Sequence, residues 1–365
     1  MKATQQLHNL GQSLWLDNIT RELLSSGTLA RYISELSVTG LTSNPTIFDH
    51  ALEHGDLYDN AIRKKTREGK SGEALFFELA VEDLQQAADL FRPVYVASDG
   101  ADGWVSLEVS PLLADDTSAT IRAALQLHAS ANRPNLFIKI PGTPAGIPAI
   151  EEAIYAGVPV NVTLLFSPEH YLAAAEAYMR GIERRIASGR DPKIASVASV
   201  FISRWDVAVK SELPGKLEKN SLGIAVAIHI YKAYRALLAS ARWQKLAAAG
   251  AGPQRLLWAS TGTKDPAASD TLYIDALAAP NTINTIPEKT LLALAAHKKI
   301  GRTLALDENY AEKIIANITR EGVIVDALAA ELQREGTESF AKSWHALLAR
   351  IAAKVDALSQ PQADR

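Results

Sequence analysis

The sequence predicts an α/β protein built on one (β/α)8 barrel, the TIM barrel fold. Two observations predict it: short β-type runs alternate with longer helical patterns, and there are eight such runs. A strand followed by a helix, repeated along the chain, implies parallel strands joined by right-handed crossovers. The alternative is an open doubly wound sheet, which is weakened because no Gly-x-Gly-x-x-Gly turn follows the first run.

The eight runs are predicted as the strands of the barrel, in chain order. The segments between them, such as ATIRAALQLHASA and PEHYLAAAEAYMRGIERRIASG, carry apolar residues at spacings of three and four, as amphipathic helices do. The strands are expected at residues 13–17, 38–43, 103–110, 135–141, 158–166, 195–203, 255–261 and 281–287.

Two stretches hold more helix than a plain barrel needs. Residues 44–92 separate the second and third strands and have a helical pattern. The chain after the eighth strand is also helical, and it includes the segment FAKSWHALLARIAAKVDAL. We predict a single barrel domain over residues 1–365, with residues 300–365 forming a C-terminal helical extension packed on it.

The composition excludes several classes of function. A net charge of −3 argues against a broad nucleic-acid surface, because phosphate backbones demand clustered Lys and Arg. The chain has no cysteine, which rules out disulfides, Cys-ligated zinc and thiol nucleophiles. Its 8 histidines show no metal-ligand spacing such as His-x-x-x-His. We therefore expect neither a metal site nor a nucleic-acid partner.

The same reading predicts a soluble cytoplasmic protein with no membrane partner. The first residues, MKATQQLHNLGQSLWLDN, lack the apolar stretch of a signal peptide. No apolar run approaches the ~18 residues of a membrane span. The oligomeric state is left open, and a homo-oligomer is compatible with the sequence.

Polar side chains at the ends of the predicted strands are the candidates for chemistry. In a barrel all strands end at one mouth, so residues far apart in the chain converge there. The candidates are Asp17, Asn44, Glu108, Lys139, Asn161, Thr163, Ser203, Arg204, Ser260, Thr261 and Lys264.

Most of these residues also have a purely structural explanation. Asp17 and Asn44 could cap the helices that follow them, and Thr163 suits a strand by propensity. Ser260 and Thr261 could be caps or turn residues. The two cations, Arg204 after the sixth strand and Lys264 after the seventh, could be solvated surface charges. They also lie near the place where barrels commonly hold phosphate on loop amides and a helix N-terminus.

Lys139 and Glu108 are harder to explain in this way, because both lie in apolar strands where an isolated charge is costly. A structural ion pair is one explanation, although such pairs are often no more stabilising than apolar residues of the same size. The other is amine catalysis. A neutral lysine attacks a carbonyl and forms a Schiff base, which accepts electrons while a carbon–carbon bond breaks.

The proton on the amine is the obstacle to this chemistry. A lysine with its ordinary pKa near ~10.4 is almost fully protonated at pH 7, and a charged amine is no nucleophile. Burial favours the neutral amine, whereas the carboxylates of Glu108 and Asp17 favour the charged one. The site works if Glu108 is protonated or reaches Lys139 through water, which leaves an acid to expel hydroxide.

The strand-end motifs, in this order, resemble those of the transaldolase family. The resemblance is closest to its longer bacterial branch, which also occurs fused to phosphoglucose isomerase, and it covers residues 1–300. The motifs are SLWLDNITRELL, GLTSNPTIF, VSLEVSP, FIKIPGT, NVTLLFS, SVFISRWD, LLWASTGTKDP and NTIPEKTL.

By this resemblance the fold is a cofactor-free barrel of the class I aldolase type, and Lys139 in FIKIP is the Schiff-base lysine. Asp17 matches the general acid/base that takes the proton of the substrate's C4 hydroxyl. Glu108 matches the acid/base that acts through a water, and Thr163 matches the residue that holds this water.

The resemblance also assigns groups that bind the substrate. Asn44, Asn161 and Ser203 match those that bind the hydroxyls of a dihydroxyacetone fragment. Shorter members of the family use two arginines for the phosphate, whereas the corresponding stretches here offer Arg204, not quite in register, and Lys264.

The implied partners are small sugar phosphates. The implied reaction moves a dihydroxyacetone unit from sedoheptulose 7-phosphate to glyceraldehyde 3-phosphate, giving erythrose 4-phosphate and fructose 6-phosphate. A fructose 6-phosphate aldolase is the nearest alternative, because transfer and cleavage differ only in what meets the enamine intermediate. The second alternative is a sugar-phosphate-binding barrel without turnover.

Overall fold

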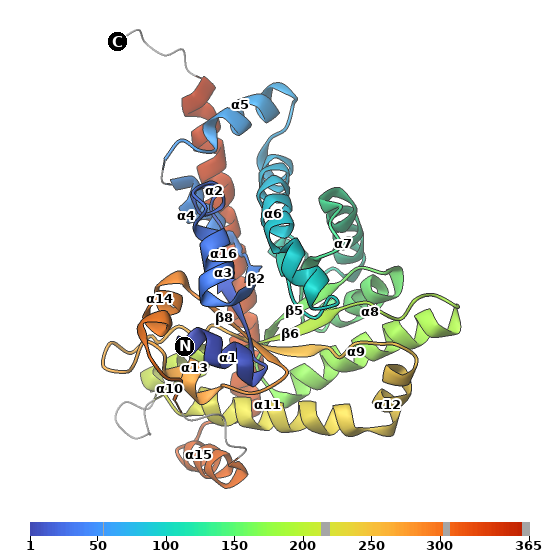
Figure 1. Ribbon diagram of the computed structural model, residues 1–365, viewed down its shortest axis with the longest axis vertical. Helices are drawn as coiled ribbons and strands as arrows, with labels where there is room; N and C mark the ends of the chain where they lie inside the picture. Colours follow the sequence, from blue (N-terminus) through green and yellow to red (C-terminus); the bar gives the residue numbers. More distant parts are fainter. Residues whose placement is uncertain (54, 213–219, 302–306, 360–365) are drawn as a thin grey trace.

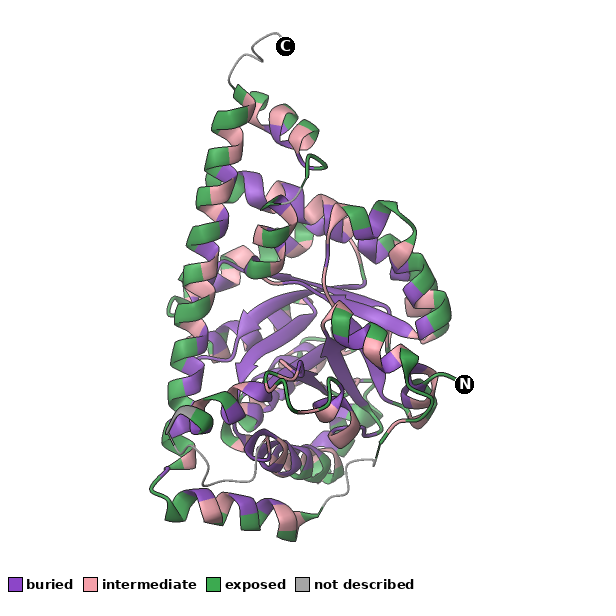
Figure 2. Cartoon of the chain, turned by 90° about the vertical axis from the view of Figure 1, so that its left-hand side faces the viewer, coloured by how far each residue is buried: buried purple, intermediate pink, exposed green. Residues whose placement is uncertain are grey.

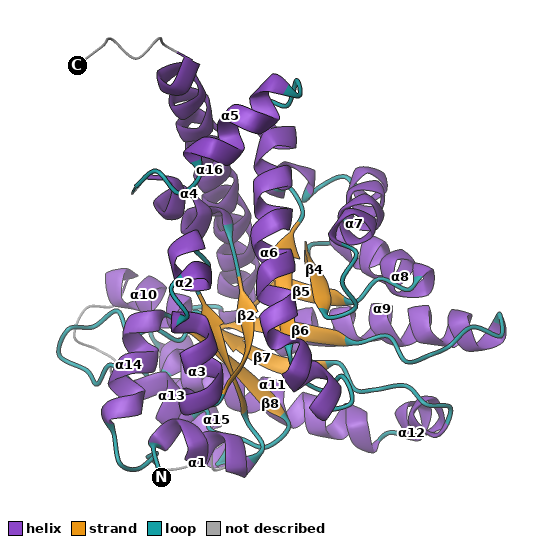
Figure 3. Ribbon diagram, turned by 45° about the horizontal axis from the view of Figure 1, so that its top comes forward, coloured by secondary structure: helices purple, strands orange, loops and turns teal. Residues whose placement is uncertain are grey.

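The computed structural model describes residues 1–53, 55–212, 220–301 and 307–359, and its centre is a closed barrel of eight parallel strands (Figure 3). The strands pair in chain order, and β1 closes the ring by pairing with β8. A closed ring excludes the open doubly wound sheet, so the predicted (β/α)8 barrel is confirmed. The strands are β1 (Ser13–Asp17), β2 (Val38–Thr42), β3 (Trp104–Glu108), β4 (Leu136–Pro141), β5 (Val160–Leu165), β6 (Ser196–Phe201), β7 (Arg255–Ala259) and β8 (Thr282–Ile286).

Each strand lies within two residues of its predicted range at either end. The prediction succeeds because parallel strands covered by helices are buried on both faces and therefore show as short apolar runs. Every residue of the eight strands is buried except the last residue of β1, Asp17, and the first residue of β7, Arg255. These two exceptions lie at opposite ends of the barrel.

Helices surround the barrel and connect its strands (Figure 1). Several begin at side chains that accept a hydrogen bond from the first turn, such as Thr20 before α2 and Ser167, which is followed by proline, before α9. The helices outside residues 44–92 and before residue 300 are α1 (Ala3–Leu10), α2 (Arg21–Ser25), α3 (Thr28–Leu36), η1 (Pro111–Leu113), α7 (Thr117–Ala131), α8 (Gly146–Ala156), α9 (Pro168–Ala187), α10 (Ser203–Glu212), α11 (Leu222–Ala239), α12 (Ala241–Ala248), α13 (Leu272–Ala276) and α14 (Glu288–Ala296), and the C-terminal stretch includes α15 (Glu308–Arg320).

The two additional helical stretches pack on each other. The C-terminal helix α16 (Val325–Ser359) lies against α4 (Pro45–Glu53), α5 (Asp59–Arg67) and α6 (Gly72–Ala97), and together they project from one side of the barrel (Figure 1). The buried side chain of Trp344 on α16 meets the rings of Phe76 and Phe77, with centroids 4.9 and 5.5 Å away. Along α16, buried and exposed residues alternate in stripes, as in an amphipathic helix (Figure 2). A single domain over residues 1–365, with 300–365 as its extension, stays a prediction.

The N-terminal half of α16 reaches the barrel itself. It packs against β5 and against η1, which follows β3, so it lies at the carboxyl ends of these strands. Polar contacts from α16 to the residues that follow β4 and β5 fix it there. The helical tail therefore borders the mouth of the barrel and is not packed beneath it.

Among the described residues one helix, α11, is long and apolar enough to cross a membrane by length and composition alone. It carries Lys232 and Arg235, and half of it is buried in the molecule. Its neighbours are α9, α10, α12 and α15, so α11 packs as a helix of the barrel's outer layer. The length and apolar composition of α11 therefore give only weak support for a membrane span.

Candidate active site

Lys139 lies on β4 with its side chain buried at the carboxyl end of the barrel. Its Nζ donates a hydrogen bond to the main-chain oxygen of Ser43 over 2.9 Å and lies 3.3 Å from Oε2 of Glu108. The strand register puts Glu108 on β3 and Asn161 on β5 directly beside it. Lys139 and Glu108 are each only 6% exposed, so amine and acid meet where little water reaches them.

Glu108 is an acid whose surroundings favour the protonated form. Burial raises the pKa of its carboxyl above the ordinary value, and the attraction of Lys139 offsets this only in part. The ion pair considered from the sequence is present. A carboxyl with a raised pKa beside an amine can exchange a proton with it, which is what amine chemistry needs.

Asp17 ends β1 on the same rim of the barrel. Its Oδ1 accepts a hydrogen bond of 2.8 Å from the hydroxyl of Thr42 on the neighbouring strand. Burial raises the pKa of the Asp17 carboxyl, whereas Lys139, the Thr42 hydrogen bond and Lys264 lower it. The capping explanation for Asp17 is wrong, because α2 starts later and is capped by Thr20.

Thr163 and Asn161 point inward from β5. Asn161 is held from both ends of its amide: Nδ2 donates to Oγ of Ser106 over 3.2 Å, and Oδ1 accepts from Ser199 over 2.6 Å. The hydroxyl of Thr163 is buried, yet it has no hydrogen-bond partner among the residues that the structure describes. A buried hydroxyl without a partner is costly, so this oxygen is suited to hold a water or a substrate group.

Three further candidates lie at other strand ends. Asn44 does cap a helix, because its Oδ1 accepts from the backbone N–H of Ile47 in the first turn of α4. The structural explanation is therefore correct for Asn44, although a cap at this rim can still offer its amide N–H to a ligand. The hydroxyls of Ser203 and Ser260, after β6 and β7, lie 2.9 Å apart and form one polar contact.

The two candidate phosphate cations differ in their surroundings. Arg204 is the second residue of α10 and is half-buried, and its guanidinium carbon lies over the rings of Phe201 and Phe340, 5.4 and 5.9 Å from their centroids. Burial lowers the pKa of Arg204, and the carboxylate of Glu335 raises it in part. Lys264 is exposed on the loop after β7 but close enough to Asp17 to attract its carboxylate.

The sequence reading missed the groups that hold the candidates in position. Thr42 joins Asp17 to Thr285 through its hydroxyl, and the carbonyl of Ser43 holds the lysine amine. Thr42, Ser106 and Ser199 could have been found from the sequence, because each is a polar residue inside an apolar strand. The contribution of Ser43 is a main-chain atom, which no residue pattern reveals.

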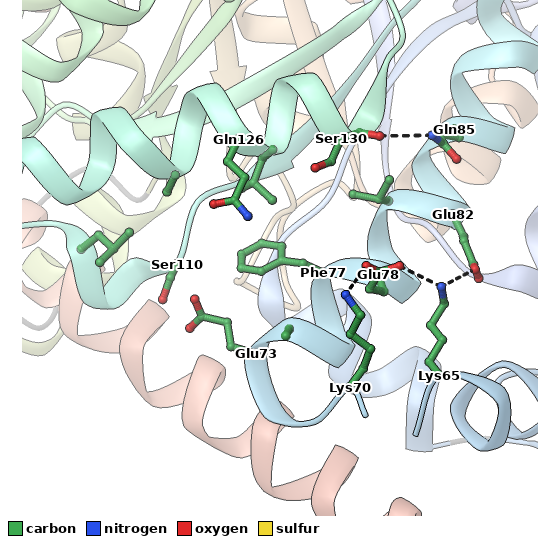
Figure 4. A pocket seen from close by; sticks show the side chains of 15 residues that line it. Lys65, Lys70, Glu73, Phe77, Glu78, Glu82, Gln85, Ser110, Gln126 and Ser130 are labelled. Carbon is green, nitrogen blue, oxygen red and sulfur yellow. Dashed lines mark hydrogen bonds and ion pairs between the residues drawn. The ribbon is translucent and has the colours of Figure 1, made fainter. Parts of the chain in front are cut away.

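A cavity of about 720 Å³ lies elsewhere, between α6 and α7 (Figure 4). Its cations are already neutralised: Lys65 bonds Glu78 and Glu82 over 2.9 and 2.8 Å, and Lys70 bonds Glu78 over 3.0 Å. None of the candidate residues lines it. Within the part of the chain that the structure describes, there is also no group of three or more acidic or histidine residues suited to hold a metal.

Comparison with known proteins agrees with this geometry. Residues 14–351 match the family described as "Transaldolase/Fructose-6-phosphate aldolase". Proteins named transaldolase from Saccharopolyspora erythraea and Thermobifida fusca are 44% and 45% identical to the chain, over 96% and 97% of its length and 97% and 98% of theirs. One from Thiobacillus denitrificans is 45% identical, over 96% of the chain and 100% of its own length.

Proposed function

The chain belongs to the transaldolase/fructose-6-phosphate aldolase family and acts as a transaldolase, and from this premise we propose that Lys139 forms its Schiff base. The enzyme moves a dihydroxyacetone unit from sedoheptulose 7-phosphate to glyceraldehyde 3-phosphate, a step of the pentose phosphate pathway. One observation carries the assignment: the buried amine lies 3.3 Å from a buried acid whose pKa burial raises. Binding alone requires no such pair.

The first half of the reaction uses all three titratable groups. The neutral amine of Lys139 attacks the ketone carbon C2, and Glu108, acting through a water held by Thr163, protonates the departing hydroxyl to give water and an iminium. Asp17 then takes the proton of the C4 hydroxyl. The C3–C4 bond breaks, its electrons move into the iminium to form an enamine, and erythrose 4-phosphate leaves.

The second half runs the same steps in reverse with a new aldehyde. The enamine carbon attacks the carbonyl of glyceraldehyde 3-phosphate, and Asp17 returns its proton to the new C4 oxygen. Water, activated by Glu108, then hydrolyses the iminium, which releases fructose 6-phosphate and the free amine. A raised pKa suits Asp17 and Glu108 to both directions, because each must accept a proton in one half and give it back in the other.

Substrate binding is assigned to the polar groups around this centre. Asn44, Asn161 and Ser203 are proposed to bind the hydroxyls of the dihydroxyacetone unit, with Ser260 beside Ser203. Arg204 and Lys264 are proposed for the phosphate, and the planar guanidinium fits two phosphate oxygens at once. No cofactor takes part in the proposal, because amine, acid and base suffice.

Borohydride trapping tests the assignment of the lysine. The enzyme is reduced in the presence of fructose 6-phosphate and digested, and the peptides are mapped by mass. A three-carbon adduct on the peptide that contains Lys139 is expected, and Lys139→Met should abolish both the adduct and the transfer of the unit. Full activity in that variant would refute the assignment.

The same preparation separates transfer from cleavage. A coupled assay that measures erythrose 4-phosphate reports transfer, and an assay for free dihydroxyacetone reports cleavage of the aldolase type. The proposal expects erythrose 4-phosphate to form at the rate at which the acceptor is consumed, with little free dihydroxyacetone.

We also propose that the enzyme works in the cytoplasm on soluble sugar phosphates, without nucleic acid or membrane as partner. Charged phosphates cross membranes poorly, which supports this location. All proposed groups come from one chain, so a homo-oligomer is compatible with the proposal but adds no residue to it. Cell fractionation with an activity readout tests the location, and light scattering tests the oligomeric state.

A further inference from the structure

The C-terminal helix α16 makes a polar contact with the two strands that carry the proposed Schiff-base lysine and the water-holding threonine. Gln333 is only 8% exposed. Its Nε2 donates to the main-chain oxygens of Gly142, over 3.0 Å, and Leu164, over 2.9 Å. Gly142 follows β4, and Leu164 lies at the end of β5, so one amide group links the ends of both strands.

The backbone at Leu164 has an unusual conformation that this contact supports. Leu164 has a φ of +60°, in the left-handed region that a leucine rarely adopts. The register between β5 and β6 shifts here: Val162 pairs with Ala198 and Leu165 with Val200, so Thr163 and Leu164 face one residue. This is a β-bulge, and its effect is to re-aim the side chains around it.

The carbonyl of Leu164 therefore needs a partner from outside the sheet. Leu164 is buried, and an unpaired buried carbonyl is costly. Gln333 supplies the hydrogen bond, and its second bond reaches Gly142, whose own N–H donates to the oxygen of Thr163 over 2.8 Å. Thr163 is thus fixed on both sides, by the bulge that it forms with Leu164 and by the last rung of the β4–β5 ladder.

A glycine on α16 allows the helix to come this close. A Cβ added to Gly336 would lie 2.8 Å from a side-chain carbon of Leu164 and 3.3 Å from Nη1 of Arg204. Glycine inside a helix costs ~1 kcal/mol relative to alanine, so its presence here has a packing reason. One turn further, Phe340 lies against the guanidinium of Arg204.

We propose that Gln333 is a positioning residue for the reaction: through the carbonyl of Leu164 it holds the bulge that aims the Thr163 hydroxyl. The inference rests on the proposed function, in which Thr163 holds the water used by Glu108. Without the two hydrogen bonds, β5 relaxes toward regular pairing and the hydroxyl turns away from that water. Proton transfer to and from the leaving hydroxyl slows, while the amine and the phosphate site stay in place.

The first test is Gln333→Leu, which keeps the volume of the side chain but removes the donor. Because misplacement by about 1 Å costs up to ~100-fold, we expect kcat to fall by about 10- to 100-fold. KM for fructose 6-phosphate should change by less than about twofold, because the proposed substrate-binding groups are untouched. The matched control is Arg334→Leu, the next residue of α16, which is exposed and should keep wild-type kcat.

A double-variant cycle with Thr163→Val separates positioning from a merely structural role. If Gln333 acts through the Thr163 hydroxyl, Gln333→Leu should lower kcat less than about threefold once that hydroxyl is gone. Two independent losses that multiply in the double variant would overturn the proposal. So would a Gln333→Leu protein with a lower unfolding temperature but wild-type kcat below that temperature.

A second variant and a parallel trapping experiment complete the test. If Gln333→Leu gives no folded protein, Gln333→Glu fills the same space and replaces the donor with an acceptor, and it should show the same loss confined to kcat. Borohydride trapping of the wild-type enzyme is run in parallel. Its failure contradicts the Schiff-base assignment, whereas normal trapping with unchanged kcat in both Gln333 variants contradicts the positioning role alone.

Discussion

The two ends of the barrel each hold a cluster of charges, and the two clusters are built differently. At the amino ends of the strands, Arg255 donates to the carbonyls of Ala101 and Thr282 and to the hydroxyl of Ser13. Its guanidinium lies 3.8 Å from Asp102, which also accepts from Ser13 and from the indole of Trp15. Both charges at this end have several partners.

The carboxyl ends of the strands show the opposite arrangement. Within the described part of the chain, Lys139 has one carbonyl and one acid as partners, Asp17 has one hydroxyl, and the hydroxyl of Thr163 has none. Burial raises the pKa of Asp17 and of Glu108. The groups at this end are under-satisfied in the free protein, and they are the ones to which a reaction is assigned.

Burial of a charged group alone therefore does not mark an active site. A charged group with a full set of hydrogen bonds stabilises the fold and is poorly suited to react, because any reaction would first have to break those hydrogen bonds. A charged group that lacks partners is costly to the fold but free to bind a substrate or exchange a proton. In barrels the first kind belongs to the amino ends and the second to the mouth.

The largest expected effect is the loss of activity in Lys139→Met. Transfer should fall by about 10⁴-fold or more, because the proposed covalent step loses its amine. The unfolding temperature should stay within a few degrees of wild type, because Glu108, whose pKa burial already raises, takes up a proton instead of remaining as an uncompensated charge. An activity assay and a thermal melt on one sample check both. A large loss of stability would place Lys139 with Arg255 among the charges that stabilise the fold.

Asp17→Asn should lower kcat by about 10²- to 10⁴-fold, because the proton of the C4 hydroxyl then has no acceptor. Its effect on stability depends on pH. Burial raises the pKa of Asp17 in the folded state above its ordinary 3.8, so the folded wild type binds this proton more tightly than the unfolded chain does. The wild type therefore loses stability relative to the variant as pH rises through that window.

Urea unfolding at a series of pH values measures this difference. The advantage of Asp17→Asn should be largest at neutral pH and should vanish toward pH ~4, where the wild-type carboxyl is protonated. An advantage that grows as the pH falls would mean that the folded protein stabilises Asp17 as a charge, and it would contradict this prediction.

Arg255→Met should produce the reverse pattern. Removing one partner of a largely buried charge pair leaves Asp102 uncompensated, so the free energy of unfolding should drop by about 3 kcal/mol. The kcat of the remaining folded protein should be unchanged, because the mouth lies at the other end of the strands. A loss of kcat at unchanged stability would contradict the claim that the charges at the amino ends serve the fold and not the reaction.

Thr163→Val should give the smallest effect. We expect a 10- to 100-fold lower rate from the loss of the hydroxyl that is proposed to hold a water. Stability should change by less than about 1 kcal/mol, because that hydroxyl has no partner to lose among the described residues. Thr163→Ser keeps the hydroxyl and should retain most of the rate. Equal losses in the valine and serine variants would assign the effect to packing.

Much of the fold could be predicted because its signals are local. Buried parallel strands are short apolar runs, and Leu136 to Pro141 shows such a run interrupted by one lysine. The position of Lys139 in that strand already required an explanation, and Glu108 stood out for the same reason. The two alternatives at Asp17 and Asn44 could not be separated in this way, because a capping residue and a ligand-binding residue look alike in a sequence.

The sequence alone predicted the eight strands, the barrel and the candidate residues at the strand ends, because hydrophobic periodicity and residue chemistry are properties of neighbouring residues. Only the tertiary structure decided which groups are satisfied and which are left without partners. It also decided that Gln333, from the far end of the chain, lies against the strand of Thr163. Hydrogen bonds between distant segments depend on the packing of the whole chain, and a bulge such as the one at Leu164 exists only once two strands have paired.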